Sequence, residues 1–473
     1  MDANGACWSQ SAHNTLCAGL LATAGVPSAF YFGTPPIPHD RYYTHHPPLL
    51  SLLLTALFGV FGEKESVARM LPITFSLIGA ALLWLLVRNC ASDRTATFCV
   101  LFFAAMPMEL RYGRMVNFES VNLVWMLGGL LCLRYWEQTG RQRWRLLMLG
   151  AFALSLWTDW LGYLFVLVLC IHLFLSGTSR YSRLAVLLVG LLGASLALFL
   201  LQVHCVQPDA VRDLLEAIHR RMALTGIRVP WLPWSLRMID SLTTHIQPVS
   251  WILGLGGGLL IWRSRVDESL RWLGWGGFYF VAMSVFYAVV FRNQSSIHDY
   301  ASFYFTIPVA IGAGVALDSI IRWCERVSSS MRTVGLAATL VLYVLLVFSG
   351  ERAAQNLRCQ FHILGSNETE PQELIPELGR MISARFPPDT AVLCNFLPDY
   401  GPQLHYYAQR ELLNCLFTPN DWKQIIADPE NAPVGGVVWM KEPRAREVLS
   451  MLPPGRREEV TIRDIHFCLW RPE

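Results

Sequence analysis

Residues 185–203 read AVLLVGLLGASLALFLLQV, a run that contains no charged side chain. A second run, at residues 70–87, reads MLPITFSLIGAALLWLLV and is also free of charge. An α-helix needs about 20 apolar residues to cross a hydrocarbon core about 30 Å thick. Further apolar blocks of this kind occur on both sides of these runs, and short loops that carry arginine separate them. The sequence therefore predicts a helical protein that crosses the membrane many times.

The overall composition excludes several other classes of protein. Of 473 residues, 53% are hydrophobic and only 15% are charged, against about 25% charged residues in soluble proteins. The formal net charge of +3 is too small to indicate a nucleic-acid partner. The 12 cysteines include no CxxC pair, so the spacing indicates neither a zinc site nor a thioredoxin-type centre.

Clustered arginines orient the chain, because short loops rich in arginine stay on the cytoplasmic side. Five loops of this kind are Arg88 and Arg94; Arg134, Arg141, Arg143 and Arg145; Arg180 and Arg183; Arg263, Arg265 and Arg271; and Arg322, Arg326 and Arg332. Two apolar segments lie between successive loops. The pattern predicts ten spans within residues 69–350, beginning near 70, 95, 119, 146, 160, 183, 247, 272, 301 and 332. Both chain ends then lie outside the cytoplasm.

Three parts of the chain are predicted to be external: residues 1–68, residues 205–246 and residues 351–473. Pro48 to Phe61 is apolar but too short for a span, which favours an interfacial or re-entrant helix. In the second part, apolar residues from Val211 to Met222 repeat at helical spacing, with arginines on the other faces. This pattern predicts an amphipathic helix on the membrane surface, with its arginines among lipid headgroups.

The third external part has a different pattern. Short β-branched runs at 390–396, 434–440 and 460–465 alternate with helical stretches at 421–427 and 443–452. The predicted fold class is therefore an all-α polytopic membrane protein, with about ten transmembrane helices and a small C-terminal extracytoplasmic α/β domain.

Polar residues gather at the outer ends of the predicted spans. Ionisable groups cost about 2.5 to 3.5 kcal/mol at mid-bilayer, so those near the membrane persist mainly where they are used. The clusters are Asp2 with Asn4; Arg41 to Pro48 (RYYTHHPP); Glu109 to Glu119 (ELRYGRMVNFE); Arg292 to Tyr300 (RNQSSIHDY); and Asp159, in the turn WTDWLGY.

Each cluster also has a purely structural interpretation. Tyr43, His45 and His46 could belong to an aromatic belt at the membrane surface. The charged residues between Glu109 and Glu119 could form an ion-pair network within their loop. His298 and Asp299 could cap the following helix, and Asp159 could be a buried hydrogen-bond partner. The glycines between 254 and 258 lie within a predicted span, where close helix packing is favoured over phosphate binding.

Taken together, carboxylates, histidines and arginines on one external face suit group transfer from an anionic lipid carrier. A carboxylate can act as base for the acceptor, and cations can stabilise the departing phosphate. Water-soluble sugar nucleotides are not expected outside the cytoplasm, so a sugar donor there would be lipid-linked.

Residues 45–72, HHPPLLSLLLTALFGVFGEKESVARMLP, add a family resemblance. The segment resembles the signature of the GT-C glycosyltransferases related to protein O-mannosyltransferases and the lipid A aminoarabinose transferase. Weaker similarity continues through Glu119 and His298, over roughly residues 1–320. The resemblance implies a polyprenyl-phosphate sugar donor, inversion at the anomeric carbon, and an acidic base just after the first transmembrane helix.

By this resemblance the base falls on Asp2. The usual Asp-Glu pair reads Asp2-Ala3 here, and residues 1–47 contain no first helix. Either the chain lacks this helix or its start was misassigned, in which case about 20 further apolar codons ahead of Met1 would restore the helix. An aspartate at a free terminus could not be held within the roughly 0.5 Å that catalysis requires. If no helix precedes Asp2, an inactive enzyme is therefore expected.

The resemblance and the clusters together assign expected roles. Asp2 deprotonates the acceptor hydroxyl, and Glu119 orients the acceptor or supports the base. The residues expected to neutralise the phosphate are Arg69, Arg114 and His298. The residues expected to shape the substrate pocket are Tyr43, His45, His46, Asp159, Asp299 and Tyr300. Neither a metal nor another cofactor is expected, because arginine alone can stabilise phosphate; a metal held by His45, His46 and a carboxylate stays open.

The sequence thus predicts a multi-pass glycosyltransferase, expected in a bacterial inner membrane, with a lipid, glycan or protein as acceptor. Two alternatives stay open. One is a transporter or flippase of the carrier lipid, in which the same arginines bind phosphate while the spans alternate their access. The other is a non-catalytic scaffold that presents the C-terminal domain to a partner in the cell envelope.

Overall fold

The chain forms two compact units in a computed structural model. The structure describes residues 3–226, 228–264, 267–359, 374–388, 390–394, 401–414, 434–440, 454–462 and 465–472. Unit 1 consists of residues 1–43, 51–68 and 359–473, and unit 2 consists of residues 44–50 and 69–358. The boundary between the units falls within the helices α3 (Leu49–Phe61) and α4 (Glu65–Cys90).

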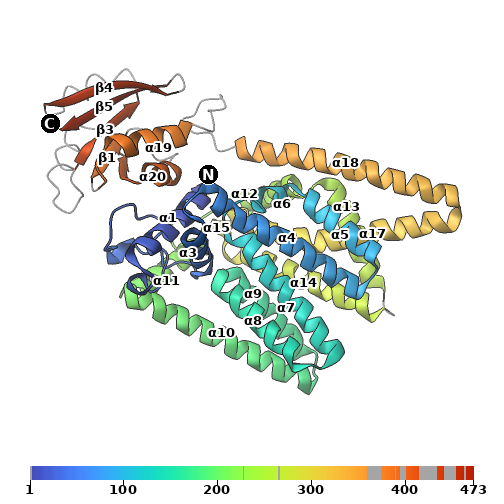
Figure 1. Ribbon diagram of the computed structural model, residues 1–473. Coiled ribbons are helices and arrows are strands. Elements are labelled where there is room, and N and C mark those ends of the chain that lie inside the picture. The colour runs from blue at the N-terminus through green and yellow to red at the C-terminus, as the bar shows by residue number, and fades with distance from the viewer. Residues whose placement is uncertain are drawn as a thin grey trace. The chain divides into compact units, whose positions relative to one another are not determined.

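Unit 2 is built from helices (Figure 1). The shorter ones are α6 (Pro107–Tyr112), α11 (Ala210–Arg221), α12 (Trp231–His245), α15 (Arg292–Ile297) and α16 (Tyr300–Phe303). The others are α5 (Asp93–Ala105), α7 (Phe118–Thr139), α8 (Gln142–Thr158), α9 (Trp160–Leu175), α10 (Ser179–Val206), α13 (Pro248–Arg263), α14 (Glu268–Val290), α17 (Thr306–Val327) and α18 (Ser329–Cys359).

Each of the ten predicted spans coincides with one of these helices: α4, α5, α7, α8, α9, α10, α13, α14, α17 and α18. Among the described residues, five segments are long and apolar enough to cross a membrane: Glu65–Cys90, Ser179–Val206, Glu268–Val290, Tyr300–Val327 and Ser329–Ala353. The protein is therefore an integral membrane protein, and the number of ten spans stays a prediction. The predicted helices at 48–61 and 211–222 are present as α3 and α11.

Glycines bring α13 and α17 into close contact, which is the packing role predicted for the 254–258 cluster. A Cβ atom on Gly257 would overlap the carbonyl group of Gly312, and one on Gly312 would overlap the carbonyl of Gly254. A Cβ on Gly256 or Gly258 would meet no atom within 4 Å. Two of the four glycines in this cluster therefore let the backbones approach, as small residues do between membrane helices.

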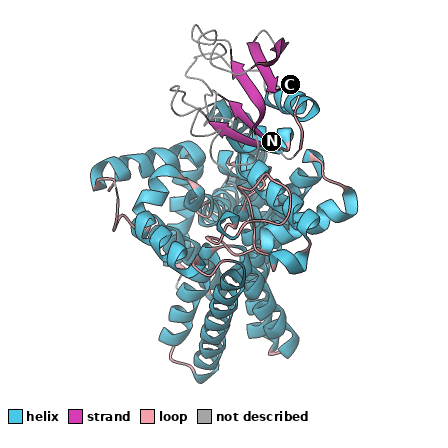
Figure 2. Ribbon diagram, turned by 90° about the vertical axis from the view of Figure 1, so that its left-hand side faces the viewer, coloured by secondary structure: helices cyan, strands magenta, loops and turns pink. Residues whose placement is uncertain are grey.

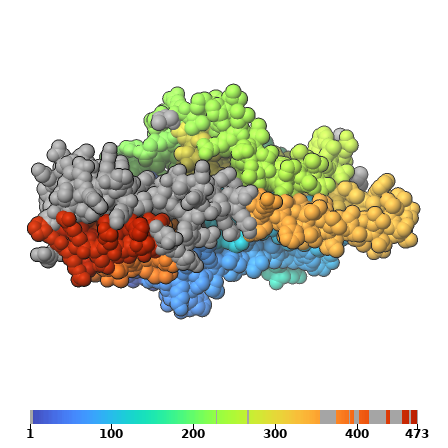
Figure 3. All heavy atoms as spheres, turned by 90° about the horizontal axis from the view of Figure 1, so that it is seen from above, coloured from blue at the N-terminus to red at the C-terminus, as the bar shows by residue number. Residues whose placement is uncertain are grey.

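The helix α18 lies on the outside of unit 2. Apolar residues such as Leu340, Leu345 and Phe348 are exposed along it, and its atoms are visible at the surface (Figure 3). The C-terminal half of α18 is nevertheless attached to the bundle, because Gln247 Nε2 donates to the carbonyl oxygen of Leu346 at 2.7 Å. An exposed apolar surface of this kind on a span is suited to lipid.

Unit 1 combines helices with the strands of the chain, which Figure 2 shows in magenta. Its N-terminal elements are α1 (Ala3–Ala18), α2 (Leu20–Thr23) and the 3₁₀ helix η1 (His39–Arg41). Its C-terminal elements are α19 (Leu374–Arg385), β1 (Ala391–Cys394), α20 (Gly401–Ala408), β2 (Glu411–Asn414), β3 (Val434–Met440), β4 (Gly455–Ile462) and β5 (Ile465–Pro472).

The five strands form one mixed sheet in the order β2-β1-β3-β5-β4. The strand β1 pairs in parallel with β2 and β3, while β5 pairs antiparallel with β3 and β4. Side chains from α19, α20 and the sheet share one apolar core, which includes Leu378, Leu404, Val438 and Leu469. The predicted C-terminal α/β domain is confirmed. The predicted helices at 421–427 and 443–452 lie outside the described residues.

Candidate functional site

The candidate site of unit 2 is built on short connections between its long helices. His45 and His46 precede α3, Asp159 stands between α8 and α9, and His298 and Asp299 stand between α15 and α16. Glu109 lies in α6, and Glu119 lies in the first turn of α7. Pro107 begins α6 and Pro48 directly precedes α3, because proline suits the first turn of a helix.

Asp299 is the most heavily contacted carboxylate of the site. Arg111 Nη1 donates to its Oδ2 at 3.2 Å, and the Tyr112 hydroxyl donates to its Oδ1. His245 Nε2 lies 3.0 Å from Oδ2. Burial by itself would raise the pKa of Asp299, but His245, Arg111 and Tyr112 outweigh it and hold the pKa well below its usual value. Asp299 is therefore an ionised anchor and is poorly suited to act as a base.

This anchor holds the two residues beside it in the chain. The rings of His298 and Tyr300 stack with their centroids 4.7 Å apart and their planes 10° apart. Asp299 makes no side-chain hydrogen bond that would cap α16, so the structural interpretation of this cluster as a helix cap is wrong. Its carboxylate is directed to α6 and α12 instead.

His46 and Asp159 form a second pair. His46 Nδ1 lies 3.2 Å from Asp159 Oδ1, and the His46 ring stacks on Phe118 at 4.8 Å. Their side chains are 17% and 7% exposed, respectively, so His46 is not a surface residue of an aromatic belt. Trp160 Nε1 donates to the carbonyl oxygen of His45 at 2.7 Å, which fixes the backbone that carries both histidines. Asp159 is both buried and bonded to His46, so it fits the structural and the functional interpretation alike.

Glu109 and Glu119 are the two buried carboxylates of the α6–α7 region. Glu109 is 6% exposed and accepts a hydrogen bond from the Ser76 hydroxyl, and burial raises its pKa to about 8. Glu109 is thus mostly uncharged near neutral pH. Glu119 is 3% exposed and accepts a hydrogen bond from Asn117 Nδ2 at 3.3 Å. Glu119 also lies within electrostatic range of Asp159, Asp299 and Arg111, so it belongs with the two pairs above.

The predicted phosphate ligands differ in their surroundings. Arg114 Nε donates to the carbonyl oxygen of Leu110 at 2.7 Å, and its Nη2 pairs with Glu351 at 3.3 Å. Arg69 Nη1 donates to the carbonyl oxygen of Arg114 at 3.4 Å. Arg114 therefore already neutralises a carboxylate, which leaves it less charge to offer an incoming anion.

Arg221, at the end of α11, is a cation that the sequence analysis did not assign to the site. Its charge acts on His45, His46 and His298. No carboxylate pairs with Arg221 in the described part of the chain. The arginines of this helix were expected among lipid headgroups, but Arg221 lies within electrostatic range of the three histidines.

The three histidines share an electrostatic environment. Burial lowers the pKa of His45 to about 4, with further lowering by Arg221, His46 and Arg220. Burial also lowers the pKa of His46 and of His298, where Arg221 adds to the effect and Asp159 and Asp299 oppose it. Arg221 and the three histidines, called the phosphate cradle below, thus interact electrostatically, and an anion bound among them would favour protonation of the histidines.

Two predicted residues cannot be placed in this cluster. Asp2 lies outside the described residues. Tyr43 belongs to unit 1, where its ring contacts Trp8 at 5.7 Å and Phe30 at 5.6 Å. The roles of both residues stay predictions.

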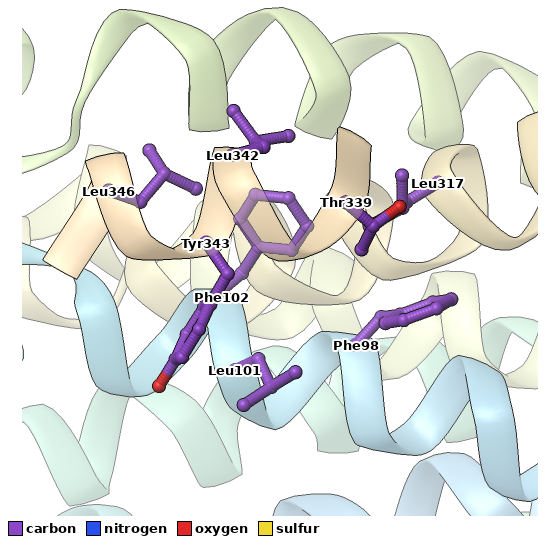
Figure 4. Close-up of a pocket in the computed structure, with 8 residues that line it drawn as sticks. All are labelled: Phe98, Leu101, Phe102, Leu317, Thr339, Leu342, Tyr343 and Leu346. Atoms are coloured by element: carbon purple, nitrogen blue, oxygen red, sulfur yellow. The ribbon is translucent and has the colours of Figure 1, made fainter. Parts of the chain in front are cut away.

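A small hollow lies elsewhere in unit 2, between α5, α17 and α18 (Figure 4). The residues lining it are Phe98, Leu101, Phe102, Leu317, Thr339, Leu342, Tyr343 and Leu346. None of these side chains is a carboxylate, histidine or arginine, so the hollow offers no group for the chemistry of the site.

The chain is similar to known proteins in sequence over part of its length and in fold over nearly all of it. Residues 45–206 match the family of dolichyl-phosphate-mannose-protein mannosyltransferases. No curated protein matches the chain in sequence. The crystal structure of ArnT from Cupriavidus metallidurans in the apo state is similar with a TM-score of 0.60 and 14% identity, over 98% of this chain and 93% of that chain. By its fold, the chain is similar to ArnT, and residues 45–206 resemble the mannosyltransferase family.

Two further solved structures share this fold. ArnT bound to undecaprenyl phosphate has a TM-score of 0.62 at 12% identity, over 99% of this chain and 93% of that chain. The apo oligosaccharyltransferase of Archaeoglobus fulgidus has a TM-score of 0.61 at 14% identity, over 95% of this chain and 67% of that chain. The predicted GT-C resemblance is confirmed, and the matched family segment contains His45, His46, Arg69, Glu119 and Asp159.

Two residues of the candidate site were not predicted from the sequence. Arg221 carried a signal, because it lies in a predicted external helix, but amphipathicity alone favoured lipid contact. His245 carried almost none, since a single histidine before the span that begins at Pro248 has no distinguishing spacing. Only the fold brings His245 of α12 to Asp299.

Proposed function

We propose that the protein is an integral-membrane glycosyltransferase that moves a sugar from a polyprenyl-phosphate donor to an acceptor on the extracytoplasmic face. The observation that carries the proposal is the cradle of Arg221, His45, His46 and His298, which suits one phosphate group. His45 and His46 belong to the segment that matches the mannosyltransferase family. An ArnT structure was solved with undecaprenyl phosphate, and an archaeal oligosaccharyltransferase with a dolichol phosphate.

In the proposed reaction the acceptor hydroxyl oxygen attacks the anomeric carbon of the donor sugar. The bond from that carbon to the phosphate oxygen breaks, and the phosphate leaves with the electron pair. The attack comes from the face opposite the phosphate, so the anomeric centre inverts. Asp2 takes the hydroxyl proton, which assigns it the role of general base.

The other residues act on the two ends of the substrate. Glu119 orients the acceptor or supports the base. Arg221 and His298 stabilise the growing negative charge on the leaving phosphate, a role in which fixed cations are effective because they need no reorganisation. Arg69 stays a further candidate for this role, whereas the ion pair of Arg114 with Glu351 supports a structural role for Arg114. Asp299 positions His298, which precedes it in the chain, and Asp159 positions His46, which it contacts at 3.2 Å.

Substitution of the proposed base tests the reaction. Asp2→Asn is expected to lower kcat by about 10² to 10⁴, because an amide cannot accept the proton, while donor affinity stays unchanged. Glu119→Gln is expected to lower kcat as well. The measurement is transfer from radiolabelled polyprenyl-phosphate sugars in proteoliposomes. Asp40→Asn is the matched control, since Asp40 is an aspartate of unit 1 whose side chain is 80% exposed. Full transfer by Asp2→Asn would remove Asp2 as the base.

The histidines make donor binding dependent on pH. The pKa values of His45, His46 and His298 lie below the usual value, so all three are mostly uncharged at pH 7. A bound phosphodiester favours their charged forms and raises these pKa values, so binding takes up protons. Donor affinity is therefore expected to rise as the pH falls from about 7.5 towards 5.5, by up to about tenfold per pH unit for each proton taken up.

Isothermal titration calorimetry with a polyprenyl-phosphate sugar measures both the affinity and the protons taken up, in buffers of different ionisation enthalpy. The melting temperature at each pH checks that the protein stays folded. His298→Asn is expected to flatten the dependence. An affinity that is constant or falls with decreasing pH would contradict the phosphate cradle.

A further inference from the structure

The C-terminal domain and the external N-terminal segment form one unit of the fold. Residues 1–43 and 51–68 group with residues 359–473 rather than with the spans. Within this unit, α1 packs against α20. The helix α1 begins at Ala3, directly after the proposed base in the chain. The packing of α20 therefore bears on the part of the chain that carries the chemistry.

Three consecutive residues of α20 each contact a different stretch of the N-terminal segment. The ring of His405 stacks on Phe32, with centroids 4.1 Å apart. The side chain of Tyr406, which is 8% exposed, shares a hydrogen bond with Ser9 of α1. The Tyr407 hydroxyl donates to Glu65 Oε2 at 2.5 Å, at the start of α4. Contacts to three stretches at once fix their mutual arrangement, which a single contact could not do.

The helix α20 is itself held in place by contacts with α19 and β2. Arg410, which is 8% exposed, donates to the carbonyl oxygens of Ser383 and Phe386 at 2.9 and 2.7 Å. These carbonyls lie at the C-terminal end of α19, where a cation is favourable. A Cβ atom on Gly379 of α19 would overlap Tyr407, so the two helices are in close contact. His405 Nε2 also lies 3.0 Å from the carbonyl oxygen of Leu412, which fixes the orientation of its ring.

We propose that His405, Tyr406 and Tyr407 position the external N-terminal segment for sugar transfer, so that the C-terminal domain is a working part of the transferase. The inference rests on the proposed function, because it assigns the base to the residue before α1. A base must be held to within about 0.5 Å of its working geometry by surrounding residues that are themselves rigid. The three side chains of α20 supply such support, and they act through the segment rather than on the substrate.

Removal of one hydroxyl tests this role without removing the domain. Tyr407→Phe is expected to lower kcat about five- to tenfold with the KM for donor unchanged, because the loss of one hydrogen bond loosens the segment but leaves the phosphate cradle intact. Glu65→Gln is expected to act in the same way. The double variant is expected to be no worse than either single one, since both changes break the same contact. Thr461→Val is the control, because it removes a contact with His466 at the surface of the same domain.

Amide hydrogen exchange of residues 3–18 provides a readout that does not need activity. Faster exchange in Tyr406→Phe and Tyr407→Phe, but not in Thr461→Val, is expected if α20 holds α1. Unchanged exchange in both tyrosine variants would overturn the contact itself. Faster exchange with an unchanged kcat would overturn the positioning role. A wild-type protein inactive with every donor would refute the proposed function, whereas the exchange result would still decide whether α20 holds α1.

Discussion

Gly257→Val is expected to prevent the protein from folding into a stable bundle. The Cβ atom would overlap the carbonyl group of Gly312, and backbone cannot move aside as a flexible side chain can. Overpacking of a core usually costs about 1 to 3 kcal/mol, and separation of two long packed helices also removes contacts along their lengths. Because natural proteins are stable by only about 5 to 15 kcal/mol, little folded protein should remain.

The same helix offers a matched control for this prediction. Gly256→Val and Gly258→Val introduce the same side chain one residue away, where a Cβ atom meets nothing within 4 Å. Both variants are expected to melt close to the wild-type temperature. The measurement is the yield of monodisperse protein in detergent together with its thermal unfolding. Equal melting temperatures for all three variants would mean that α13 and α17 are not packed as described.

Arg221→Ala is expected to weaken donor binding by about 10- to 100-fold. Loss of one partner of a buried charge pair costs about 2 to 5 kcal/mol, and a half-buried arginine should fall at the lower end of that range. Arg212→Ala is the control, since Arg212 lies on the same helix but is 66% exposed and pairs with Asp209. The measurement is the affinity of each variant for a polyprenyl-phosphate sugar, compared with that of the wild-type protein.

The histidines give this variant a distinctive dependence on pH. Arg221 lowers the pKa of His45, His46 and His298, so its removal lets these pKa values rise towards their usual range. More of the histidine is then charged at a given pH, and the binding defect should shrink as the pH falls towards about 5.5. A defect of the same size at every pH, or equal binding by Arg212→Ala and Arg221→Ala, would place Arg221 outside the phosphate site.

The architecture of the spans was predictable because hydrophobicity over a whole helix is a strong signal. The segments predicted near 119 and 146 are α7 (Phe118–Thr139) and α8 (Gln142–Thr158), which begin within a few residues of the expected positions. The short strands β1 and β3 were also predicted, since runs of Val and Leu between polar residues indicate buried strands. The helix α12 was missed, because its tryptophans and its internal proline break the helical pattern.

The site was only partly predictable, because its contacts join residues far apart in the chain. His46 pairs with Asp159 and Arg111 pairs with Asp299, and no local pattern specifies such pairs. The sequence could indicate which clusters of residue types belong to the site, and it did so for both pairs. It could not indicate that Asp299 has three donors around it, that Arg114 pairs with Glu351, or that Arg221 lies within electrostatic range of the histidines. These contacts depend on the orientation of side chains, which is determined by how the helices pack against one another.

The discontinuous make-up of unit 1 has a consequence for biosynthesis. Its first stretch leaves the ribosome long before residues 401–411, which complete the contacts around it. Contacts between such distant residues form slowly and late in folding. The early stretch therefore stays incompletely packed until α20 has been synthesised, and a chain that ends before residue 401 would contain the helices of unit 2 but would lack the contacts between α20 and α1.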